Sequence, residues 1–439
     1  MKKLLTIVFV LTISVALYAQ QLSKVYALSE GGFSAGSSKL SVLDVQTNNF
    51  TQSIFSPGNI GLYPDGLIFH ENYLYLTEQG NYLSSGKIYK LDTLGNVINS
   101  AVVGTNPYSL TIANSKIYLT NGPASNVTIL NLNDFSFIKN VSVGVYPQEI
   151  ISFNDKIFVA NNSLFGGASD STVSVIDPVL DSVVATIIVK KDPSSFAVSN
   201  DNFLFVGCPG DENSGKVFKI NPVSLEIVES ISIPAYGVGK DISVDKNSND
   251  IFLIGYTNDI VKYNLVTQNS SLILSSVFPN NYYYGYGFDY TKKRHYVLDA
   301  KNFTVEGSML IVDSTSTILS NYATGIAPRR LLFKYNGSST DVNENYIVNS
   351  FNLEQNYPNP FNPTTKINWQ SPVSGWQTLK VYDILGNEVA TLVDEYNSAG
   401  NYSIDFSANN LASGIYIYSL TINDGKKNLT LSKKMTVLK

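Results

Sequence analysis

The segments Lys156-Ile-Phe-Val-Ala160, Val173-Ser-Val-Ile-Asp177 and Val183-Val-Ala-Thr-Ile-Ile-Val189 follow one another along the chain. A shorter apolar segment precedes them, with Ile150 three residues after Pro147. Short alternating strands that are separated by Gly, Asn, Asp or Ser turns predict a four-stranded antiparallel sheet. A sheet of this kind cannot bury both of its faces alone, so we expect it to stack against similar sheets.

The same unit recurs through the middle of the chain every 40 to 46 residues. Each copy opens at an anchor residue, and a large apolar residue follows three positions later. The anchors are Pro64, Pro107, Pro147, Pro193, Gly239, Gly285 and Pro328. Repeats of about this length, with four strands each, predict the blades of a β-propeller.

The two ends of the repeat predict how the ring closes. Pro328 is followed by one strand, Arg330-Leu-Leu-Phe-Lys334, whereas the N-terminal region supplies three strands near residues 24–28, 39–44 and 50–54. Together they complete one blade and leave no open seam. The predicted fold class is therefore all-β: a seven-bladed propeller with a composite closing blade, followed by a small Ig-like β-sandwich.

Two segments of the third repeat carry a family resemblance. Residues 156–161 and 173–177 resemble the YVTN-type, YncE-like bacterial propellers, which carry Tyr-Val-Ala-Asn followed by Val-Ser-Val-Ile-Asp. The resemblance covers about residues 23–336, and the fifth and sixth repeats depart from it because they lack the anchor proline. It implies the fold and little about the chemistry, since one fold hosts many functions.

Residues 351–439 contain a second set of motifs, which are Asn356-Tyr-Pro-Asn-Pro-Phe-Asn-Pro-Thr-Thr365, Val381-Tyr-Asp-Ile-Leu-Gly-Asn-Glu-Val389, Gly414-Ile-Tyr-Ile-Tyr418 and Lys433-Lys-Met-Thr-Val-Leu-Lys439. This region resembles the type A C-terminal sorting domain of the type IX secretion system of Bacteroidetes. The resemblance implies recognition by the type IX translocon and removal by a surface sortase near the preceding linker.

The same resemblance implies a sorting signal that includes Gly414, Tyr416, Lys433, Lys434, Met435 and Lys439. The alternative is that these residues only build the sandwich, with Lys433 and Lys434 at a solvated strand end. We also expect Gly414 to supply a backbone conformation that is closed to bulkier residues.

The N-terminus has the pattern of an export signal. Lys2 and Lys3 precede the apolar residues 4–17, and Ala19 is a small residue at the expected cleavage point, with cleavage after Ala16 as the alternative. The apolar stretch is shorter than the roughly 20 residues of a membrane span. We therefore predict a signal peptide at 1–19, a propeller at 23–336, a linker at 337–350 and a sorting domain at 351–439. The expected location is the medium or the outer-membrane surface, reached through a Sec signal and the periplasm, with no membrane span in the mature chain.

Composition and the absence of known motifs exclude several classes of function. The net charge is −5 and Lys and Arg are not clustered, so no nucleic-acid partner is expected. Two histidines and the single Cys208 cannot form a zinc cluster, and neither a Gly-x-Ser-x-Gly elbow nor a phosphate-binding loop occurs. We interpret Cys208 as a buried strand residue. We predict no catalytic residue, no metal ligand and no cofactor; residues 211–215 and 245–250 are oxygen-rich, and we interpret them as turns rather than calcium sites.

The residues that follow the anchors are the candidate ligand site, because propellers bind ligands where the inner strands converge. They are polar, aromatic and of mixed charge: Asp65, Tyr108, Gln148, Glu149, Lys240, Asp241, Tyr286, Arg329 and Arg330. The alternative is a set of ordinary solvated loop positions. The tyrosine-rich segment 282–290 has two interpretations as well, a stacking surface or an inner strand packed between blades.

Three functions remain open from the sequence. The candidate site at the mouth of the channel is polar and aromatic, and the sequence contains few recognisable catalytic motifs. This favours a non-enzymatic module that binds a ligand, a glycan or an envelope protein. The alternative is a hydrolase or lactonase-like propeller that uses a divalent cation in its channel. The third is a structural surface component without a small-molecule site.

Overall fold

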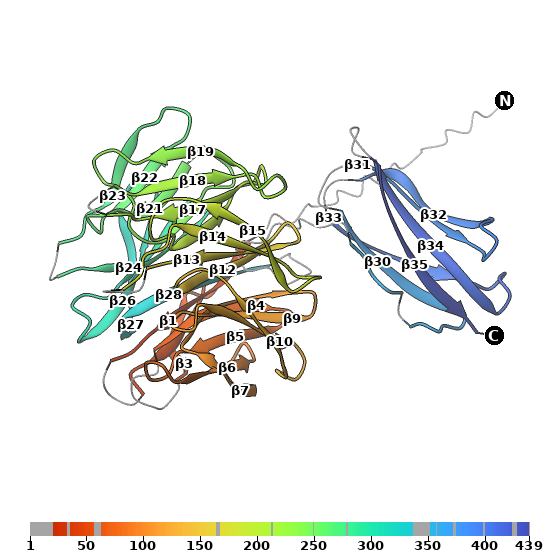
Figure 1. Cartoon of the computed structure of the whole chain (residues 1–439), viewed down its shortest axis with the longest axis horizontal. Coiled ribbons are helices and arrows are strands. Elements are labelled where there is room, and N and C mark those ends of the chain that lie inside the picture. The colour runs from red at the N-terminus through yellow and green to blue at the C-terminus, as the bar shows by residue number, and fades with distance from the viewer. Residues whose placement is uncertain are drawn as a thin grey trace, which may run out of the picture.

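A computed structural model describes residues 21–32, 36–56, 63–163, 167–211, 214–248, 250–277, 280–336, 352–356, 358–371, 375–397, 400–423 and 428–438. The predicted signal peptide, the predicted linker and Lys439 lie outside these residues. Every regular element in the described part of the chain is a β-strand (Figure 1). It follows that none of these residues belongs to a helix long and apolar enough to cross a membrane.

Six consecutive four-stranded antiparallel sheets form blades 1 to 6, in chain order. Blade 1 contains β4 (Pro64–His70), β5 (Tyr73–Glu78), β6 (Ser85–Leu91) and β7 (Val97–Thr105). Blade 2 contains β8 (Pro107–Ala113), β9 (Lys116–Asn121), β10 (Asn126–Asn131) and β11 (Phe137–Ser142). Blade 3 contains β12 (Pro147–Phe153), β13 (Lys156–Asn161), β14 (Thr172–Asp177) and β15 (Ser182–Ile188).

The next three blades have the same order. Blade 4 contains β16 (Ser195–Val198), β17 (Leu204–Cys208), β18 (Lys216–Ile220) and β19 (Ile227–Ser232). Blade 5 contains β20 (Ile242–Val244), β21 (Asp250–Ile254), β22 (Ile260–Asn264) and β23 (Ser270–Leu274). Blade 6 contains β24 (Tyr283–Asp289), β25 (Arg294–Asp299), β26 (Glu306–Val312) and β27 (Ile318–Ile326).

The closing blade, blade 7, joins the two ends of the propeller. Its sheet has the order β28-β1-β2-β3, with β28 (Pro328–Asn336), β1 (Gln21–Ser29), β2 (Lys39–Asp44) and β3 (Asn49–Phe55). Antiparallel pairing runs along β28 from Pro328, opposite Ser29, to Asn336, opposite Gln21. The predicted seven-bladed propeller with a composite closing blade is confirmed, and the ring closes through backbone hydrogen bonds between residues about 300 positions apart.

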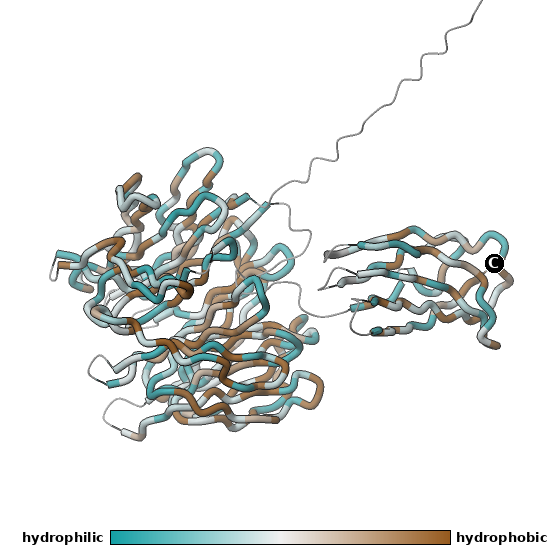
Figure 2. Tube along the Cα trace, turned by 90° about the horizontal axis from the view of Figure 1, so that it is seen from above, coloured by the Kyte–Doolittle hydropathy of each residue, from teal (hydrophilic) through white to brown (hydrophobic). Residues whose placement is uncertain are grey.

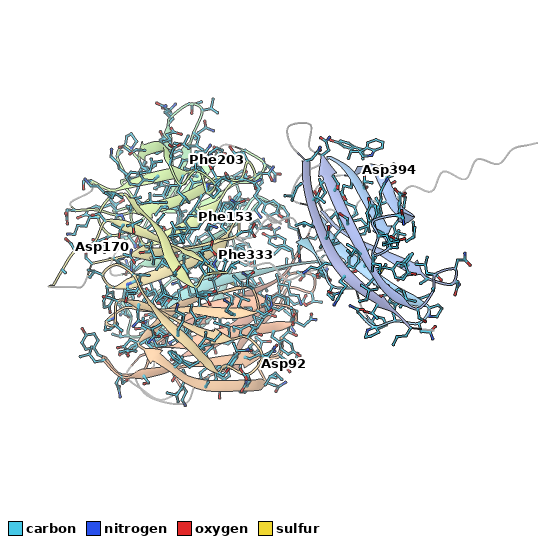
Figure 3. The ribbon with its side chains drawn as sticks, turned by 45° about the vertical axis from the view of Figure 1, so that its right-hand side comes forward. Asp92, Phe153, Asp170, Phe203, Phe333 and Asp394 are labelled. Atoms are coloured by element: carbon cyan, nitrogen blue, oxygen red, sulfur yellow. The ribbon has the colours of Figure 1, made fainter. Side chains whose placement is uncertain are left out.

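The core lies between the blades, because each sheet buries the side chains of both faces against its neighbours. Buried hydrophobic clusters join neighbouring blades, and hydrophobic stretches recur throughout the propeller in Figure 2. Phe153 and Phe333 are almost fully buried in this packing (Figure 3). Cys208 is fully buried, as predicted, and burial raises the pKa of its thiol to about 12. The free thiol is therefore a packing residue.

A recurrent backbone turn leads into the inner strands. The residue before each of the five anchor prolines has a positive φ, between 41° and 62°. These residues are Tyr63, Asn106, Tyr146, Asp192 and Ala327. A left-handed conformation is unfavourable for residues with a Cβ, so each turn must be held by the strand that follows it.

The C-terminal unit is a β-sandwich. One sheet has the order β29-β30-β33, with β29 (Asn352–Leu353), β30 (Thr364–Ser371) and β33 (Gly400–Ser407). The other has the order β32-β31-β34-β35, with β31 (Gly375–Tyr382), β32 (Glu388–Asn397), β34 (Gly414–Asn423) and β35 (Asn428–Val437). Their inner faces meet in one hydrophobic core, which confirms the predicted sandwich.

The predicted sorting residues occupy two kinds of position. Tyr416 and Met435 are paired across β34 and β35, and both are buried. Lys433 and Lys434 are exposed on β35. The expectation for Gly414 was wrong: it is not among the positive-φ residues, and a Cβ there would meet only the Tyr416 ring at 4.0 Å.

Candidate functional site

The seven inner strands begin at one end of the axial channel, but the anchor in blade 6 is not the predicted one. In blades 1, 2 and 3 the anchor and the third residue after it pair with residues two apart on the next strand. In blade 6 this pattern starts at Tyr283 and ends at Tyr286. The anchor is therefore Tyr283 rather than Gly285, and the residue that follows it is Tyr284.

The glycine that suggested the other register has a packing role. A Cβ on Gly285 would lie 2.2 Å from the carbonyl oxygen of Arg329 on the neighbouring inner strand. A Cβ on Gly66, the equivalent residue of blade 1, would lie 2.9 Å from the carbonyl oxygen of Tyr108. Both positions need glycine because two inner strands approach each other there.

Arg330 of β28 connects three blades at the mouth. Its Nε donates to Asp65 Oδ1 of blade 1 at 2.6 Å. Its Nη2 forms an ion pair with Glu149 of blade 3. Asp65 is fully buried, and its charge would be costly without this partner. Burial raises the pKa of Glu149, and the two arginines oppose that shift. Arg330 also lies over the ring of Tyr108 in blade 2, with 5.7 Å from Cζ to the ring centroid.

Arg329 reaches the other side of the ring. Its Nη1 lies 2.8 Å from Asp241 Oδ2 of blade 5 and donates to the Tyr284 carbonyl oxygen of blade 6 at 3.1 Å. The same carboxylate accepts a hydrogen bond from the backbone N–H of Tyr286 at 3.0 Å. The two consecutive arginines of the closing blade therefore contact blades 1, 2, 3, 5 and 6.

A third cation lies beside this network. Lys240 Nζ is 4.5 Å from the centroid of the Tyr284 ring, and the Tyr284 hydroxyl donates to Glu30 at 3.1 Å. Burial, with the positive charge of Arg329, lowers the pKa of Lys240 to about 8. Burial, with the negative charge of Asp65, raises the pKa of Glu30 to about 7. Near neutral pH this part of the mouth can therefore change its charge.

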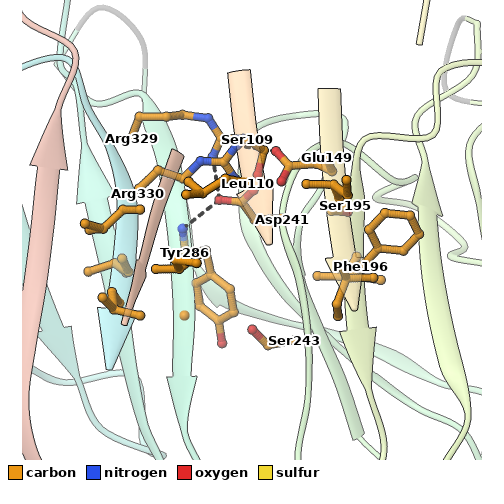
Figure 4. A pocket seen from close by; sticks show the side chains of 18 residues that line it. Ser109, Leu110, Glu149, Ser195, Phe196, Asp241, Ser243, Tyr286, Arg329 and Arg330 are labelled. Carbon is orange, nitrogen blue, oxygen red and sulfur yellow. Dashed lines mark hydrogen bonds and ion pairs between the residues drawn. The ribbon is translucent and has the colours of Figure 1, made fainter. Parts of the chain in front are cut away.

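Beneath the arginines lies a cavity of about 160 Å³. All seven inner strands line it, and Figure 4 shows the guanidinium groups turned toward Asp241 and Glu149, with Tyr286 and Ser243 further along the channel. The polar lining residues are Ser109, Glu149, Ser195, Asp241, Ser243, Arg329 and Arg330. Leucine, isoleucine and phenylalanine side chains form much of the remaining wall. A concave site with a few convergent polar groups is the usual form of a small-molecule site.

Two lining residues carry buried polar atoms that have no hydrogen-bond partner within the described part of the chain. These atoms are Arg329 Nε and Ser195 Oγ, and both residues are more than nine-tenths buried. Buried polar atoms are nearly always paired, so each one needs an explanation. Both atoms are closed to a water molecule, so they are gaps in the hydrogen bonding of the wall rather than contact points for a ligand.

The structure brings most of the predicted site residues together. Asp65, Tyr108, Glu149, Lys240, Asp241, Arg329 and Arg330 converge around the channel mouth. Gln148 instead accepts a hydrogen bond from Asn162 of its own blade at 3.2 Å. Tyr286 lines the cavity, but its hydroxyl bonds His295 Nδ1 at 2.8 Å between aromatic side chains. Sequence reasoning missed Tyr284 as a mouth residue and missed Glu30, which follows a strand that carries no anchor.

The tyrosine-rich segment divides between its two interpretations. Tyr283 and Tyr286 are buried between blades, as the packing interpretation predicts. Tyr282 and Tyr284 are half-buried, and both contact the ring of Phe303. Tyr284 is thus the member of this segment that contacts Lys240 and Glu30 at the channel mouth.

The carboxylates offer little to a metal ion. Within the described residues, no group of three or more His, Cys, Asp or Glu side chains is placed to hold one. Asp65, Glu149 and Asp241 each pair with an arginine instead. In the oxygen-rich turn after β20, the Ser248 hydroxyl lies 3.0 Å from Asp245 and 2.9 Å from Asp250.

The C-terminal sandwich belongs to a recognised type of domain. Residues 355–437 match the family described as a secretion system C-terminal sorting domain. The C-terminal unit is thus a type IX sorting domain, which supports export of the chain to the medium or the cell surface and an interaction with the secretion machinery. The signal peptide and the resemblance to YncE-like propellers stay predictions.

Solved structures resemble this chain in fold. A quinonprotein alcohol dehydrogenase-like protein from Bacteroides thetaiotaomicron has 16% identity and a TM-score of 0.55, over 72% of this chain and 79% of its own. A putative 6-phosphogluconolactonase from Bacteroides fragilis has 12% identity and a TM-score of 0.53, over 71% and 98%. Hydrazine synthase from Kuenenia stuttgartiensis has 15% identity and a TM-score of 0.50, over 60% and 87%. At these identities the likeness shows the fold alone.

No curated protein matches the chain. The propeller, however, matches a defined family over residues 24–309, which is more than half of the 439 residues. On this match the chain belongs to the family described as a domain of unknown function (DUF5074).

Proposed function

We propose that this protein is an exported, non-enzymatic binding module, and that its ligand site is the mouth and cavity of the propeller channel. One observation carries the proposal: all seven inner strands converge on a cavity whose lining includes the charged side chains of Glu149, Asp241, Arg329 and Arg330.

The path of β28 leads away from this site. The strand begins at the mouth with Pro328 and Arg329 and ends with Asn336 opposite Gln21, at the other end of the blade. The C-terminal end of β28 therefore lies at the end of the blade away from the mouth.

The size of the cavity separates the candidate ligands. A volume of about 160 Å³ is about half of the roughly 300 Å³ at which drug-sized pockets begin. The cavity alone therefore suits a small molecule. A glycan chain or an envelope protein would contact the surrounding mouth residues, such as Tyr108, Lys240 and Tyr284, and place one terminal group in the cavity.

The test is a binding screen with the full chain. Isothermal titration calorimetry against small sugars, small acids and amines, followed by glycan arrays and envelope-protein fractions, covers these classes. We expect one binding site per chain. The variant Arg329→Met should weaken binding, because it removes one of the two cations that line the cavity, whereas Arg294→Met on β25 should leave affinity unchanged. The proposal fails if no class binds or if Arg329→Met binds as tightly as the wild type.

A further inference from the structure

The order of residues around the cavity identifies a ligand class. We infer that the cavity binds one small, uncharged, polyhydroxylated molecule of the size of a single sugar ring. The inference rests on the proposed binding function and narrows it to one kind of ligand.

In five of the seven blades the second residue after the anchor lines the cavity, and these five residues form the polar ring. In blades 1 and 6 the same position is Gly66 and Gly285. From blade 2 to blade 5 these residues are Ser109, Glu149, Ser195 and Asp241, so hydroxyl and carboxylate groups alternate. In blade 7 the same position is Arg330. A carboxylate only accepts hydrogen bonds and a guanidinium only donates them, whereas a hydroxyl group does both. A ligand with several hydroxyl groups can therefore satisfy each member of this ring.

Charge pairing within the ring argues against a charged ligand. Arg330 already pairs with Asp65 and Glu149, and Arg329 with Asp241. An anion would have to compete with these carboxylates, and a cation would have to displace an arginine. Removing one partner of a buried pair is strongly unfavourable. An uncharged ligand needs neither displacement, and its hydroxyl groups can bond the polar side chains of Ser109 and Ser243 that line the cavity.

The cavity size limits the ligand to one ring. The site is smaller than the roughly 300 Å³ at which drug-sized pockets begin. Below the polar ring the wall includes Ile150, Phe196 and Leu332. The carbon-bound hydrogens of a sugar ring would pack against these apolar side chains while its hydroxyl groups face the polar ring.

The test compares two variants of the same blade. Ser243 of β20 lines the cavity, and Ser271 of β23 is exposed on the outer strand. Ser243→Leu fills the cavity with apolar atoms, and Ser271→Leu makes the same chemical change far from it. Calorimetry with the full chain would use neutral monosaccharides, their uronic acid and amino sugar counterparts, neutral disaccharides, and simple carboxylates and amines. Thermal unfolding of both variants establishes that they fold.

We expect at least one neutral monosaccharide to bind at one site per chain. Ser243→Leu should weaken that binding about tenfold or more, and Ser271→Leu should not change it. Tighter binding of a charged counterpart would overturn the ligand class while leaving the proposed binding function intact. Neutral-sugar binding that survives Ser243→Leu would overturn the location. The absence of monosaccharide binding at millimolar concentration would overturn the inference, and the proposed function fails only if the whole binding screen is also negative.

Discussion

Arg330 of β28 and Glu149 of β12 form an ion pair across the propeller axis, between the closing blade and a blade that is not its neighbour. Two blades separate them along that side of the ring, and the guanidinium also binds the buried Asp65 of the first of these. The closing blade is therefore held in two ways: by the β-ladder between β28 and β1, and by side chains that cross the channel.

This relationship makes Arg330 important for stability. Arg330→Met should lower the free energy of unfolding by about 3–5 kcal/mol, because it leaves the fully buried Asp65 without its cation. Urea denaturation, followed by a probe that reports the propeller, measures the change. Arg294→Met is the matched control and should stay within about 0.5 kcal/mol of the wild type. Equal effects of the two substitutions would show that the ion pairs across the channel contribute nothing.

The titration of Glu30 gives a prediction on pH. Burial and the charge of Asp65 raise its pKa from 4.5 to about 7 in the folded chain. The contribution of this shift to stability is fully present below pH 4.5 and is lost as the pH rises through about 7. Glu30→Gln removes the ionisation, so its stability relative to the wild type should increase from pH 5 to pH 8.

Unfolding curves of both proteins over this pH range measure that difference. Glu229→Gln, on the exposed outer strand β19, is the control and should run parallel to the wild type. Burial and Arg329 lower the pKa of Lys240 from 10.5 to about 8, so this group affects stability in a higher pH range. Its contribution is present above pH 10.5 and is lost as the pH falls through about 8, so measurements up to pH 7 report mainly Glu30. A constant difference between Glu30→Gln and the wild type would contradict the raised pKa of Glu30.

The sequence was sufficient to predict the propeller, because the repeat shows the strand pattern of each blade and the incomplete repeats at its two termini show how the ring closes. Pro328 with a single following strand, and three N-terminal strands without an anchor, predicted the composite blade that β28 and β1 form. Most of the mouth was predictable for the same reason, since a fixed offset from the anchor leads to one end of the channel.

The remaining features of the site could not be predicted from the repeat pattern. Glu30 follows β1, which is a second strand and has no anchor. Tyr284 was missed because the repeat pattern predicts Gly285 as the anchor of blade 6. The glycine is needed there because the carbonyl oxygen of Arg329 lies close to it, and not because it forms an anchor turn. The pairing of Arg330 with Glu149 was also not predictable, because it joins blades that are not neighbours and depends on the diameter of the ring.

The pairing of the carboxylates yields a prediction on metal content. Asp65, Glu149 and Asp241 each bind an arginine, so the channel has no free carboxylate cluster among the described residues. Elemental analysis of the purified full chain should find divalent metal well below one ion per chain. Treatment with EDTA should leave the thermal midpoint unchanged. One tightly held ion per chain, with loss of stability on its removal, would instead support a cation-dependent hydrolase.

The last prediction separates recognition from folding in the sorting domain. Lys433 and Lys434 are exposed on β35, whereas Tyr416 and Met435 are buried in the sandwich core. Lys433→Glu together with Lys434→Glu should therefore leave the sandwich folded but move most of the protein from the medium or cell surface to the periplasm. Lys366→Glu with Lys380→Glu changes the charge equally at other positions of the sandwich and should not alter export. Cell fractionation of the source organism, with intact mass of each fraction, measures both outcomes. Normal export of the first variant would mean that the two lysines are only a solvated strand end.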